Sequence, residues 1–401
     1  MTIYLYLQIV TVMRPTNPFF TTNRIPQEFF CDRENETETL IKEIVNGNNM
    51  LLMSPRRMGK TGLVNHCYED KRIKDNFEVF FIDIYDTSSI KELTFRLGKE
   101  IYDRMSLVHK VKTRGFLDCL RSLRGELSYD PLIMAPRFVL SVGQIREPEM
   151  TLDEMLSYLE DLDKPCIIAI DEFQRIADYE ENNVEAMLRT KIQRLTNVRF
   201  IFSGSERHLL SQMFSSHTRP FYQSAGVMEL KAIEETNYIR FAQRLFHEYG
   251  KDISSEAVSA VYRMMDGYTY FIQRTLNHTF GESPEGWKVS DDEIPYRIDT
   301  LLDSESATFK NILAMLSLNQ RLLLSAIARD RKAVNILSGE FVARHNLGVP
   351  SSVQSSARSL LKKQLISRAG NQYYIDDKFL ELWLRKEAGV QLSSFGKNQY
   401  I

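Results

Sequence analysis

The residues best suited to chemistry occupy one short run. They are Ser54, Pro55, Arg56, Arg57, Met58, Gly59, Lys60 and Thr61, followed directly by Gly62. The run stands between an apolar stretch, Met50–Met53, and a helical pattern that continues to Tyr68. Backbone N–H groups in such a strand-to-helix loop can surround phosphates, and the helix N-terminus adds positive potential. We therefore expect a phosphate-binding loop (Walker A) in which Lys60 reaches the β- and γ-phosphate oxygens and Thr61 ligates Mg²⁺.

One position departs from the usual pattern of this loop, GxxxxGK[ST]. Ser54 stands where the first glycine is usual. A serine can make the same turn if its backbone stays within ordinary φ and ψ ranges, so the prediction of a phosphate site is retained. The alternative is a Gly-Lys-Thr that occurs by chance at the start of a helix.

Two adjacent acids follow the apolar run Cys166–Ile170 and would complete such a site. Asp171 is expected to support the Mg²⁺ shell, and Glu172 to polarise the attacking water (Walker B). Two solvated acids at the end of a strand are the plain alternative. The Gly-Lys-Thr upstream in the same alternating chain favours the catalytic interpretation.

A third polar segment, Ser203-Gly204-Ser205, follows the apolar run Val198–Phe202. Ligands of open α/β sheets lie at the carboxyl ends of the strands. Ser203 or Ser205 is therefore expected to hydrogen-bond the γ-phosphate or the attacking water. A turn, or an N-cap for the helix that starts near Glu206, is an equally weighted alternative.

Three arginines have open assignments. Arg219 follows the third segment at a distance along the chain that suits an arginine finger, acting in its own chain or on a neighbouring subunit. Its alternative is a surface arginine in a loop. Arg56 and Arg57 are expected to contact either a partner molecule or the region of Glu172.

The apolar pattern predicts the elements that must position these residues. The predicted strands are Met50–Met53, Val79–Ile84, Cys166–Ile170 and Val198–Phe202, with Val227–Leu230 as a weaker fifth. A predicted helix, Asp32–Val45, precedes the first strand, and the helices predicted between the strands include Ile90–Met105, Leu152–Asp161 and Val184–Leu195. Strands that alternate with helices indicate an open α/β sheet covered on both faces. Residues 126–144 contain two β-like runs, Leu127–Tyr129 and Phe138–Val142, and predict an inserted hairpin.

The strand signal ends near Glu234, helices dominate to about Gly281, and the acidic stretch Glu282–Pro295 indicates a boundary. A second module follows, with predicted helices at Asn319–Arg329, Gly339–Asn346 and Pro350–Gln364 and a hairpin at Leu365–Ile375. That order of elements predicts a winged helix. Its terminal aromatic helix around Trp383 is expected to pack on its own core.

The winged-helix module carries the one locally basic region of the chain. From Arg329 to Gly370 there are eight Lys or Arg residues and two acids. Small or amide side chains near the start of its third helix could face phosphates or base edges, namely Ser351, Ser352, Gln354 and Ser355. DNA binding is one expectation for this surface, and protein docking or autoinhibition is the alternative.

Composition bounds the protein class. With 401 residues the chain can form two or three domains, and 43% apolar with 26% charged residues is ordinary for a folded globular protein. The net charge is −2, so binding to nucleic acid or to a membrane would need a local patch. The four cysteines form no CxxC pair and the seven histidines no cluster, which predicts free thiols in a reducing cytoplasm.

The first residues, Met1–Met13, are apolar but too short to span a bilayer. They also lack the basic start and the cleavage pattern of a signal peptide. They form either an added strand or a stretch upstream of a true start at Met13, with a weak signal peptide as a third alternative. No other stretch reaches the roughly 18 apolar residues of a membrane helix, so we expect a soluble cytoplasmic protein without membrane contact.

Together these motifs resemble the AAA+-related ATPases of archaea and bacteria that lie close to the STAND NTPases, in particular bacterial members with a C-terminal winged helix. The resemblance covers nearly the whole chain from about Asn17. It is carried by Phe30-Cys31-Asp32-Arg33-Glu34, the SPRRMGKT loop, Ile167–Ile176, Phe202–Ser205 and Tyr373–Leu384.

The resemblance implies a P-loop NTPase fold with a parallel five-stranded sheet and ATP as the nucleotide. Its implied parts are a tail over 1–28, a core over 29–230, a helical lid at about 231–290 and a winged helix over 296–401. Asp32 and Arg33 would lie near the adenine, and Ser203 to Ser205 would take the sensor-1 place. The lid run Gly267-Tyr268-Thr269 lacks the proline of the related Gly-x-Pro, which weakens the expectation that Thr269 contacts the nucleotide.

These observations predict a Mg²⁺-dependent ATPase of low turnover that acts as a nucleotide-controlled switch. The alternative is a nucleotide-gated regulator or scaffold with negligible hydrolysis, which would present its winged helix to DNA or to a protein partner. A P-loop kinase is a third interpretation, but no acceptor-substrate site is visible. An oligomer is compatible with the first two.

Overall fold

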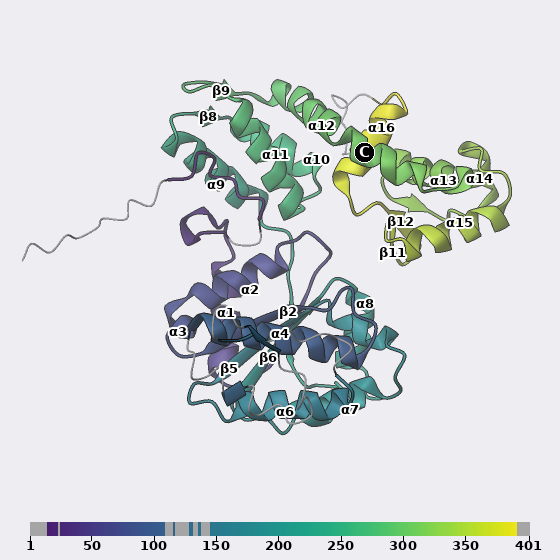
Figure 1. Ribbon diagram of the computed structural model, residues 1–401. Helices are drawn as coiled ribbons and strands as arrows, with labels where there is room; N and C mark the ends of the chain where they lie inside the picture. Colours follow the sequence, from purple (N-terminus) through teal and green to yellow (C-terminus); the bar gives the residue numbers. More distant parts are fainter. Residues whose placement is uncertain are drawn as a thin grey trace, which may run out of the picture. The chain divides into compact units, whose positions relative to one another are not determined.

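The computed structural model describes residues 14–22, 25–108, 115–116, 128–130, 135–137 and 145–390. The chain divides into two compact units, and Figure 1 labels most of their helices and strands. The first, which we call the sheet unit, is Asn23–Ala232. The second, the helical unit, combines Met1–Thr22 with Ile233–Ile401. The runs Met1–Met13 and Phe138–Val142, for which the sequence raised expectations, lie outside the described residues.

The sheet unit is built on five parallel strands. They are β1 (Met50–Met53), β2 (Glu78–Asp83), β5 (Cys166–Asp171), β6 (Val198–Gly204) and β7 (Gly226–Glu229). Their order in the sheet is β2-β5-β6-β1-β7, and every neighbouring pair is parallel. The predicted parallel five-stranded sheet is confirmed. Because β6 lies between β1 and β5, the carboxyl ends of these three strands adjoin.

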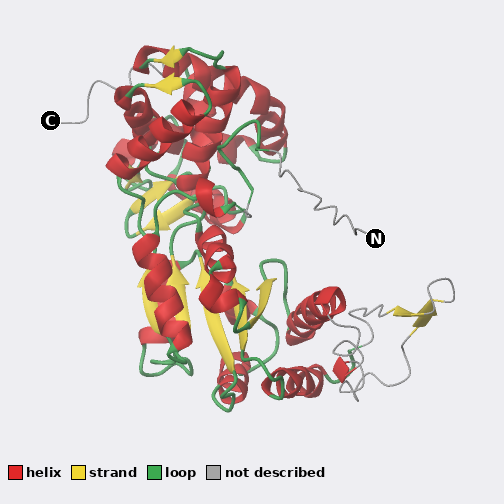
Figure 2. Cartoon of the chain, turned by 90° about the vertical axis from the view of Figure 1, so that its left-hand side faces the viewer, coloured by secondary structure: helices red, strands yellow, loops and turns green. Residues whose placement is uncertain are grey.

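Helices cover both faces of this sheet, as Figure 2 shows. One face carries α1 (Glu34–Val45), α2 (Lys60–Glu69) and α3 (Lys71–Lys74), and the other carries α4 (Ile90–Val108), α6 (Pro148–Glu160), α7 (Val184–Ile192) and α8 (Arg207–Ser215). Along β1, Met50 and Leu52 enter the core on the α1 side, whereas Leu51 and Met53 enter the opposite core. A strand buried on both faces has no solvent-facing positions, which explains its continuous apolar pattern.

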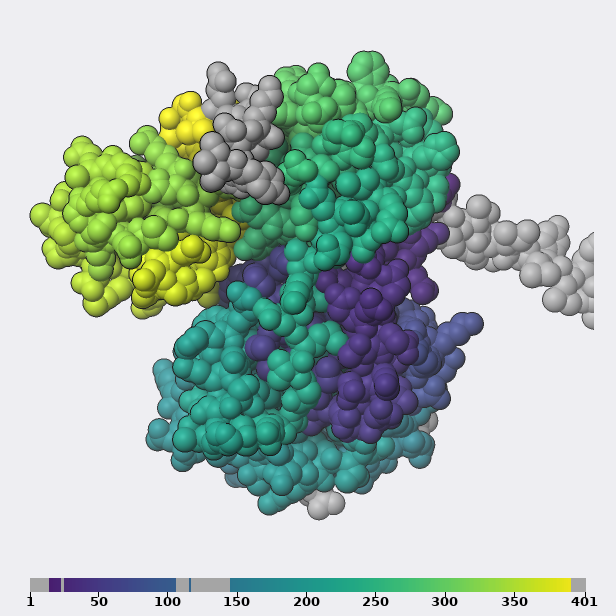
Figure 3. Space-filling model, turned by 180° about the vertical axis from the view of Figure 1, so that it is seen from behind, coloured from purple at the N-terminus to yellow at the C-terminus, as the bar shows by residue number. Residues whose placement is uncertain are grey.

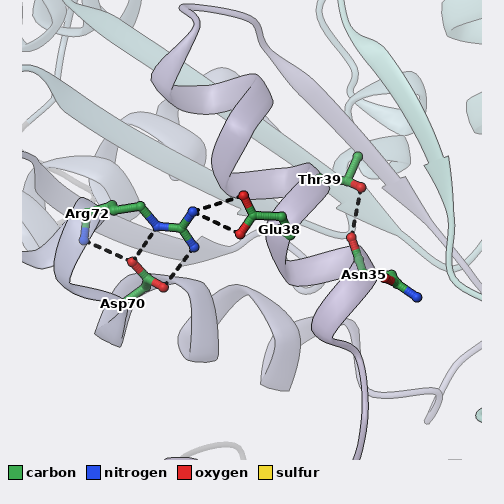
Figure 4. Close-up of polar contacts among 5 residues, drawn as sticks. All are labelled: Asn35, Glu38, Thr39, Asp70 and Arg72. Carbon is green, nitrogen blue, oxygen red and sulfur yellow. Dashed lines mark hydrogen bonds and ion pairs between the residues drawn. The ribbon is translucent and has the colours of Figure 1, made fainter.

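Polar contacts on the surface join α1 to the start of α3 (Figure 4). Asp70 caps α3 by accepting a hydrogen bond from the backbone N–H of Arg72 at 2.9 Å. The Arg72 guanidinium also lies 2.8 Å from Glu38 of α1, where the Thr39 hydroxyl donates to the carbonyl of Asn35. Exposed ion pairs of this kind add little to stability. The apolar core therefore holds α1 against the sheet.

A small two-stranded sheet follows α4 and precedes α6 along the chain. β3 (Ser128–Asp130) and β4 (Ala135–Arg137) pair antiparallel, within the residues 126–144 where the sequence predicted an insertion. β4 contains Pro136, opposite Tyr129. Proline has no N–H to donate, and it is tolerated at sheet edges.

A segment from the start of the chain completes the first part of the helical unit, which we call the lid after the helical lid that the resemblance implies. The lid elements are α9 (Glu235–Glu248), β8 (Asp252–Ile253), α10 (Ser255–Met264), α11 (Thr269–Glu282) and β9 (Lys288–Val289). Phe19 is fully buried, with its ring 6.0 Å from Phe241 and 5.5 Å from Phe246. The Asn17 amide donates to the carbonyl of Asn277 at 2.9 Å, and Asn277 donates back to the carbonyl of Phe19 at 2.7 Å. Residues 17–19 are thus part of the lid core.

The rest of the helical unit is a winged helix. Its helices are α12 (Ile294–Ala314), α13 (Leu318–Asp330), α14 (Gly339–Arg344), α15 (Pro350–Lys362) and α16 (Lys378–Glu387), and its strands are β10 (Ala333–Val334), β11 (Ser367–Ala369) and β12 (Gln372–Tyr374). The strands pair antiparallel in the order β10-β12-β11. The predicted winged helix is confirmed, and Trp383 is buried with its ring 5.5 Å from that of Phe309. The two-residue strand β10 is too short to leave a periodic signal in the sequence.

The lid and the winged helix lie side by side within the helical unit, as Figure 3 shows from behind. The rings of Phe271 on α11 and Phe379 on α16 are 4.9 Å apart. Beside them, Lys378 of α16 contacts Asp266, in the turn before α11. Among the helices that the structure describes, none has the length and apolar character needed to cross a membrane.

Candidate nucleotide-binding site

The strand order brings three polar segments to one edge of the sheet. The phosphate-loop run begins after β1. Asp171 ends β5 and Glu172 follows it, whereas Ser203 and Gly204 end β6 and Ser205 follows. Leu52 pairs with Ser203 and Met53 with Gly204 in the register, so the three strands end at nearly the same level. Parallel strands that end together place their polar ends around one crevice.

The loop after β1 contains left-handed residues, a feature of the backbone nests that can bind anions. Gly59 has φ +94°, and Arg57 φ +65°, so both occupy the left-handed region. Ser54 does not, which meets the condition under which serine can replace the usual glycine. Its hydroxyl donates to the carbonyl of Pro55 at 2.9 Å. Met58 is buried and anchors the loop, and α2 begins directly at Lys60.

Lys60 is folded back onto its own loop. Its Nζ donates to the carbonyls of Ser54 at 3.0 Å and of Pro55 at 3.3 Å. Burial lowers the pKa of Lys60, whereas the carboxylates of Asp171 and Glu172 act to raise it. A buried ammonium that is held mainly by neutral carbonyls is suited to exchange them for phosphate oxygens, because charge-assisted hydrogen bonds are the stronger ones.

Asp171 links the three segments. Its Oδ2 accepts a hydrogen bond from the Thr61 hydroxyl at 2.9 Å, and its Oδ1 accepts one from the Ser203 hydroxyl at 2.6 Å. The two residues predicted to hold Mg²⁺ are therefore in direct contact. Ser203 orients the carboxylate of Asp171, a role that the sequence did not suggest for it.

Glu172 occupies a strained position next to Asp171. Its φ is +55°, a left-handed conformation that is uncommon for residues other than glycine. Its Oε2 accepts hydrogen bonds from Nε2 of Gln174 at 2.5 Å and from the Ser205 hydroxyl at 2.7 Å. Strain of this kind costs about 1–3 kcal/mol and collects at functional sites.

The remaining loop arginines point to different surroundings. The Nε of Arg56 lies 3.4 Å from the Ser205 hydroxyl, and its guanidinium carbon lies 5.0 Å from the ring centre of Tyr85. Arg56 therefore reaches the neighbourhood of Glu172, one of its two predicted contacts. Arg57 is exposed. A Cβ atom on Gly62 would lie at ordinary van der Waals distance from the ring of Phe30.

Asp32 and Arg33 form the left-handed turn that starts α1, with φ +55° and +82°. The Arg33 guanidinium is buried and donates to Glu36 at 2.6 Å and to the carbonyl of Lys231 at 2.7 Å. Arg33 thus ties the start of α1 to the chain that leaves β7. Next to this turn, the Phe30 ring stacks on His66 of α2 at 4.1 Å.

Two residues at the site escaped sequence analysis. Gln174 is buried against Glu172, and its only sequence signal was its place two residues after the acid pair. Asp83 ends β2 beside β5, where burial and the carboxylates of Asp171 and Glu172 raise its pKa. A polar residue at the end of the neighbouring strand would have been the signal for Asp83.

Arg219 and Thr269 are placed by other contacts. Arg219 forms an ion pair with Glu185 at the start of α7. Burial raises the pKa of Glu185, and the charge of Arg219 opposes this. Thr269 begins α11 and belongs to the helical unit. The sheet unit therefore brings together the phosphate loop, the two acids and the serines, while Arg219 pairs within its own chain.

The donor set at this edge fits Mg²⁺ with a polyphosphate. Mg²⁺ prefers oxygen ligands and is usually bound by one or two carboxylates, phosphate oxygens and water. Thr61 and Asp171 supply such oxygens, and Asp83 ends the neighbouring strand, where burial and then the carboxylates of Asp171 and Glu172 raise its pKa. In the described residues there is no group of three His, Cys, Asp or Glu side chains that could hold a metal without such a ligand.

Comparison with known protein families bears directly on this site. Residues 30–274 match the model of an ATPase domain predominantly from Archaea, which is more than half of the chain. The chain belongs to this ATPase family. Residues 307–386 of the ATPase match a probable winged helix domain. The protein thus combines a domain of this ATPase family with a C-terminal winged helix, as the sequence predicted.

Solved structures that share the fold of this ATPase include the following two. A Walker-type ATPase of Pyrococcus abyssi aligns with a TM-score of 0.57 and 20% identity, covering 92% of this chain and 99% of that chain. The ORC2 protein of Aeropyrum pernix, solved in ADPNP–ADP complexes, aligns with a TM-score of 0.53 and 14% identity, covering 93% and 98%. At these identities the likeness concerns the fold alone. Comparison with curated proteins gives no match.

Proposed function

We propose that this ATPase binds ATP with Mg²⁺ in the sheet unit, hydrolyses it slowly, and acts as a STAND-like switch in the cytoplasm. The observation that carries the proposal is the convergence of Lys60, Thr61, Asp171 and Glu172 around the carboxyl end of β6. Family membership supports nucleotide binding. The A. pernix protein of similar fold, solved in ADPNP–ADP complexes, agrees with an adenine nucleotide.

Each residue at the site has a role in this proposal. Lys60 exchanges its carbonyl partners for β- and γ-phosphate oxygens, and Thr61 with Asp171 holds the metal. When bound, Mg²⁺ supplies polarisation of the phosphate oxygens. Glu172 orients the attacking water and accepts its proton. Ser203 keeps Asp171 in the orientation that metal binding needs.

Low turnover is supported by the placement of Arg219. An arginine that reaches the transferred phosphate accelerates hydrolysis by roughly 10³–10⁵-fold. Arg219, the candidate from the sequence, is engaged by Glu185 instead. We propose that hydrolysis stays slow while this ion pair persists, which suits a switch whose nucleotide state must last.

Phosphate release with and without Mg²⁺ tests the hydrolysis. Lys60→Ala should abolish binding of a fluorescent ATP analogue, because it removes the buried cation of the loop. Glu172→Gln should retain binding and lose turnover. Lys42→Ala and Glu180→Gln change exposed residues of the same types and serve as controls. Hydrolysis by Glu172→Gln at the wild-type rate would refute the assignment of the base.

DNA binding by a nucleotide-gated regulator is the second candidate function, supported by one face of α15. Ser351, Ser355, Arg358 and Lys362 are exposed and recur every three or four residues, so they share a face of the helix. Arg368 on β11 is exposed as well. A recognition helix with small and basic side chains, flanked by a basic hairpin, suits contact with a phosphate backbone.

The structure narrows the basic region that the sequence indicated. Its eight members are Arg329, Arg331, Lys332, Arg344, Arg358, Lys362, Lys363 and Arg368. Arg331 forms ion pairs with Asp266 and Glu381, and Arg344 forms one with Asp330. The basic surface proposed for DNA is therefore centred on α15 and β11.

Salt-dependent binding to a labelled duplex tests this second function. Charge removal in Arg358→Ala/Lys362→Ala should lower affinity and reduce the salt slope by about 2, one for each lost phosphate contact. Lys288→Ala/Lys310→Ala removes two exposed lysines from other elements of the same unit and is the matched control. An unchanged salt slope in the α15 variant would exclude this face as the DNA contact.

A further inference from the structure

We infer that Gln174 is a positioning residue of the proposed ATP hydrolysis: together with Ser205 it holds Glu172 in the orientation that activates water. The inference rests on the proposed function and adds to it the residue that aims the base. Gln174 lies in the 3-10 helix Phe173–Asp178 that follows Glu172, and its side chain is 1% exposed.

Both donors contact the same oxygen of Glu172. Nε2 of Gln174 lies 2.5 Å and Oγ of Ser205 lies 2.7 Å from Oε2. Hydrogen bonds to an ionised acceptor are short and strong, so the pair fixes the plane of the carboxylate. In the described part of the chain Oε1 of Glu172 accepts no hydrogen bond, which leaves that oxygen to receive the proton of water.

The two donors also come from opposite sides of the base. Gln174 belongs to the segment after β5, whereas Ser205 follows β6, the strand next to it. Among the described residues, these two donors make the only hydrogen bonds to the Glu172 carboxylate. A catalytic group is effective only when it is held close to its productive geometry.

The amide oxygen of Gln174 argues against a role for this side chain in packing alone. Its Oε1 is buried and, within the described residues, has no hydrogen-bond partner. Burying an amide oxygen without a partner costs free energy, which an apolar side chain of similar length would avoid. An unsatisfied buried group needs an explanation, and the hydrogen bond from Nε2 to Glu172 supplies one here.

The next strand leaves space for this amide at Gly204. A Cβ on Gly204 would lie 2.0 Å from Oε1 of Gln174 and 2.9 Å from Cδ1 of Leu210. The φ of Gly204 is not positive, so its backbone conformation does not itself require glycine. The glycine between Ser203 and Ser205 thus accommodates Gln174, and filling it with a methyl group should expel the amide.

Gln174→Met tests the inference, since it keeps length and volume but removes the donor. We expect kcat to fall by roughly 10-fold to 100-fold, the range for loss of a group that orients a reacting one. The dissociation constant for an ATP analogue should stay within about twofold, and the nucleotide-free protein should melt no lower than wild type. Gln193→Ala, at an exposed glutamine of the same unit, is the matched control.

Gly204→Ala provides a second variant, in which Gln174 is displaced rather than replaced, and should reproduce the loss in kcat. A wild-type or raised kcat in Gln174→Met overturns the inference. A loss of kcat that comes with a similar fold loss of nucleotide affinity, or with a lowered melting temperature, overturns it as well. Should Gln174→Met not fold, kcat in Gly204→Ala decides in the same way. A wild-type chain without turnover refutes the proposed function and this inference together, whereas a hydrolysing wild type with an unaffected Gln174→Met refutes the inference alone.

Discussion

The buried ion cluster between the lid and the winged helix gives a prediction with a calculable size. The Lys378 side chain is 4% exposed, and its Nζ lies 2.7 Å from both Asp266 and Glu381. Glu381 is 1% exposed. Arg331 lies 2.7 Å from Asp266 and 3.3 Å from Glu381. Removing Lys378 therefore leaves Glu381 buried and dependent on Arg331.

Lys378→Met should destabilise the helical unit by about 3 kcal/mol. Breaking a buried ion pair costs about 3–5 kcal/mol, because the remaining charge stays desolvated. We expect the lower end, since Arg331 still contacts both acids. At about 2–4 °C per kcal/mol for a unit of this size, the melting temperature should fall by about 6–12 °C.

Tryptophan fluorescence during urea unfolding measures this loss selectively. The sequence has two tryptophans, Trp287 and Trp383, and both belong to the helical unit. Lys386→Met is the control on the same helix: its Nζ also lies 2.7 Å from two acids, Asp299 and Asp303, but its side chain is 28% exposed. The control should lose about 0–1 kcal/mol. Equal losses in the two variants would refute the reasoning from burial.

The pH dependence of the same cluster has a defined sign. Burial by itself lowers the pKa of Lys378, but Glu381 and Asp266 outweigh it and leave the pKa raised. A basic group with a raised folded pKa stabilises fully below its unfolded pKa and loses this contribution as pH rises through the folded value. The stability difference between wild type and Lys378→Met should thus be constant up to about pH 10 and shrink above it. A difference that shrinks between pH 7 and 9 would contradict this.

Three further predictions concern the sheet unit. Burial lowers the pKa of Lys60. Affinity for an ATP analogue should therefore begin to fall at a lower pH than about 10.4, the ordinary lysine value. An affinity that stays unchanged beyond that pH would contradict the prediction. Thr61→Ala should leave affinity in EDTA within about twofold but abolish the tightening by Mg²⁺, because it removes an oxygen ligand; tightening equal to wild type would exclude Thr61 from the metal. Arg33→Ala should destabilise the sheet unit by about 2 kcal/mol through loss of its charged hydrogen bonds to Glu36 and Lys231, and an unchanged circular-dichroism melt would exclude that role.

The sheet and the phosphate loop could be predicted because their signals are local. The apolar run Cys166–Ile170 is buried on both faces, and an unbroken apolar stretch records that environment directly. The observed strand β5 is one residue longer than the predicted run and ends at Asp171, so the first of the two acids lies at the edge of the sheet. The Gly-Lys-Thr turn is equally local, since its glycine and lysine act within a few residues of each other.

Contacts between distant segments carried no such signal. The sequence placed Arg331 in a basic surface, but the structure pairs it with Asp266 and Glu381. Arg219 was a candidate finger, and it lies in the loop after α8, whereas its partner Glu185 lies on α7. An ion pair between remote residues depends on which helices pack together, and residue type alone does not reveal it.

The phosphate loop shows where the two sources of information divide. Sequence alone determined that Lys60 and Thr61 follow a buried strand and that Asp171 and Glu172 end another, because composition and periodicity are properties of short segments. Only the tertiary structure decided that Thr61 and Ser203 both reach Asp171, and that Gln174 and Ser205 meet on one oxygen of Glu172. The physical reason is the order of the strands: β6 lies between β1 and β5, and that order is set by the packing of the whole sheet.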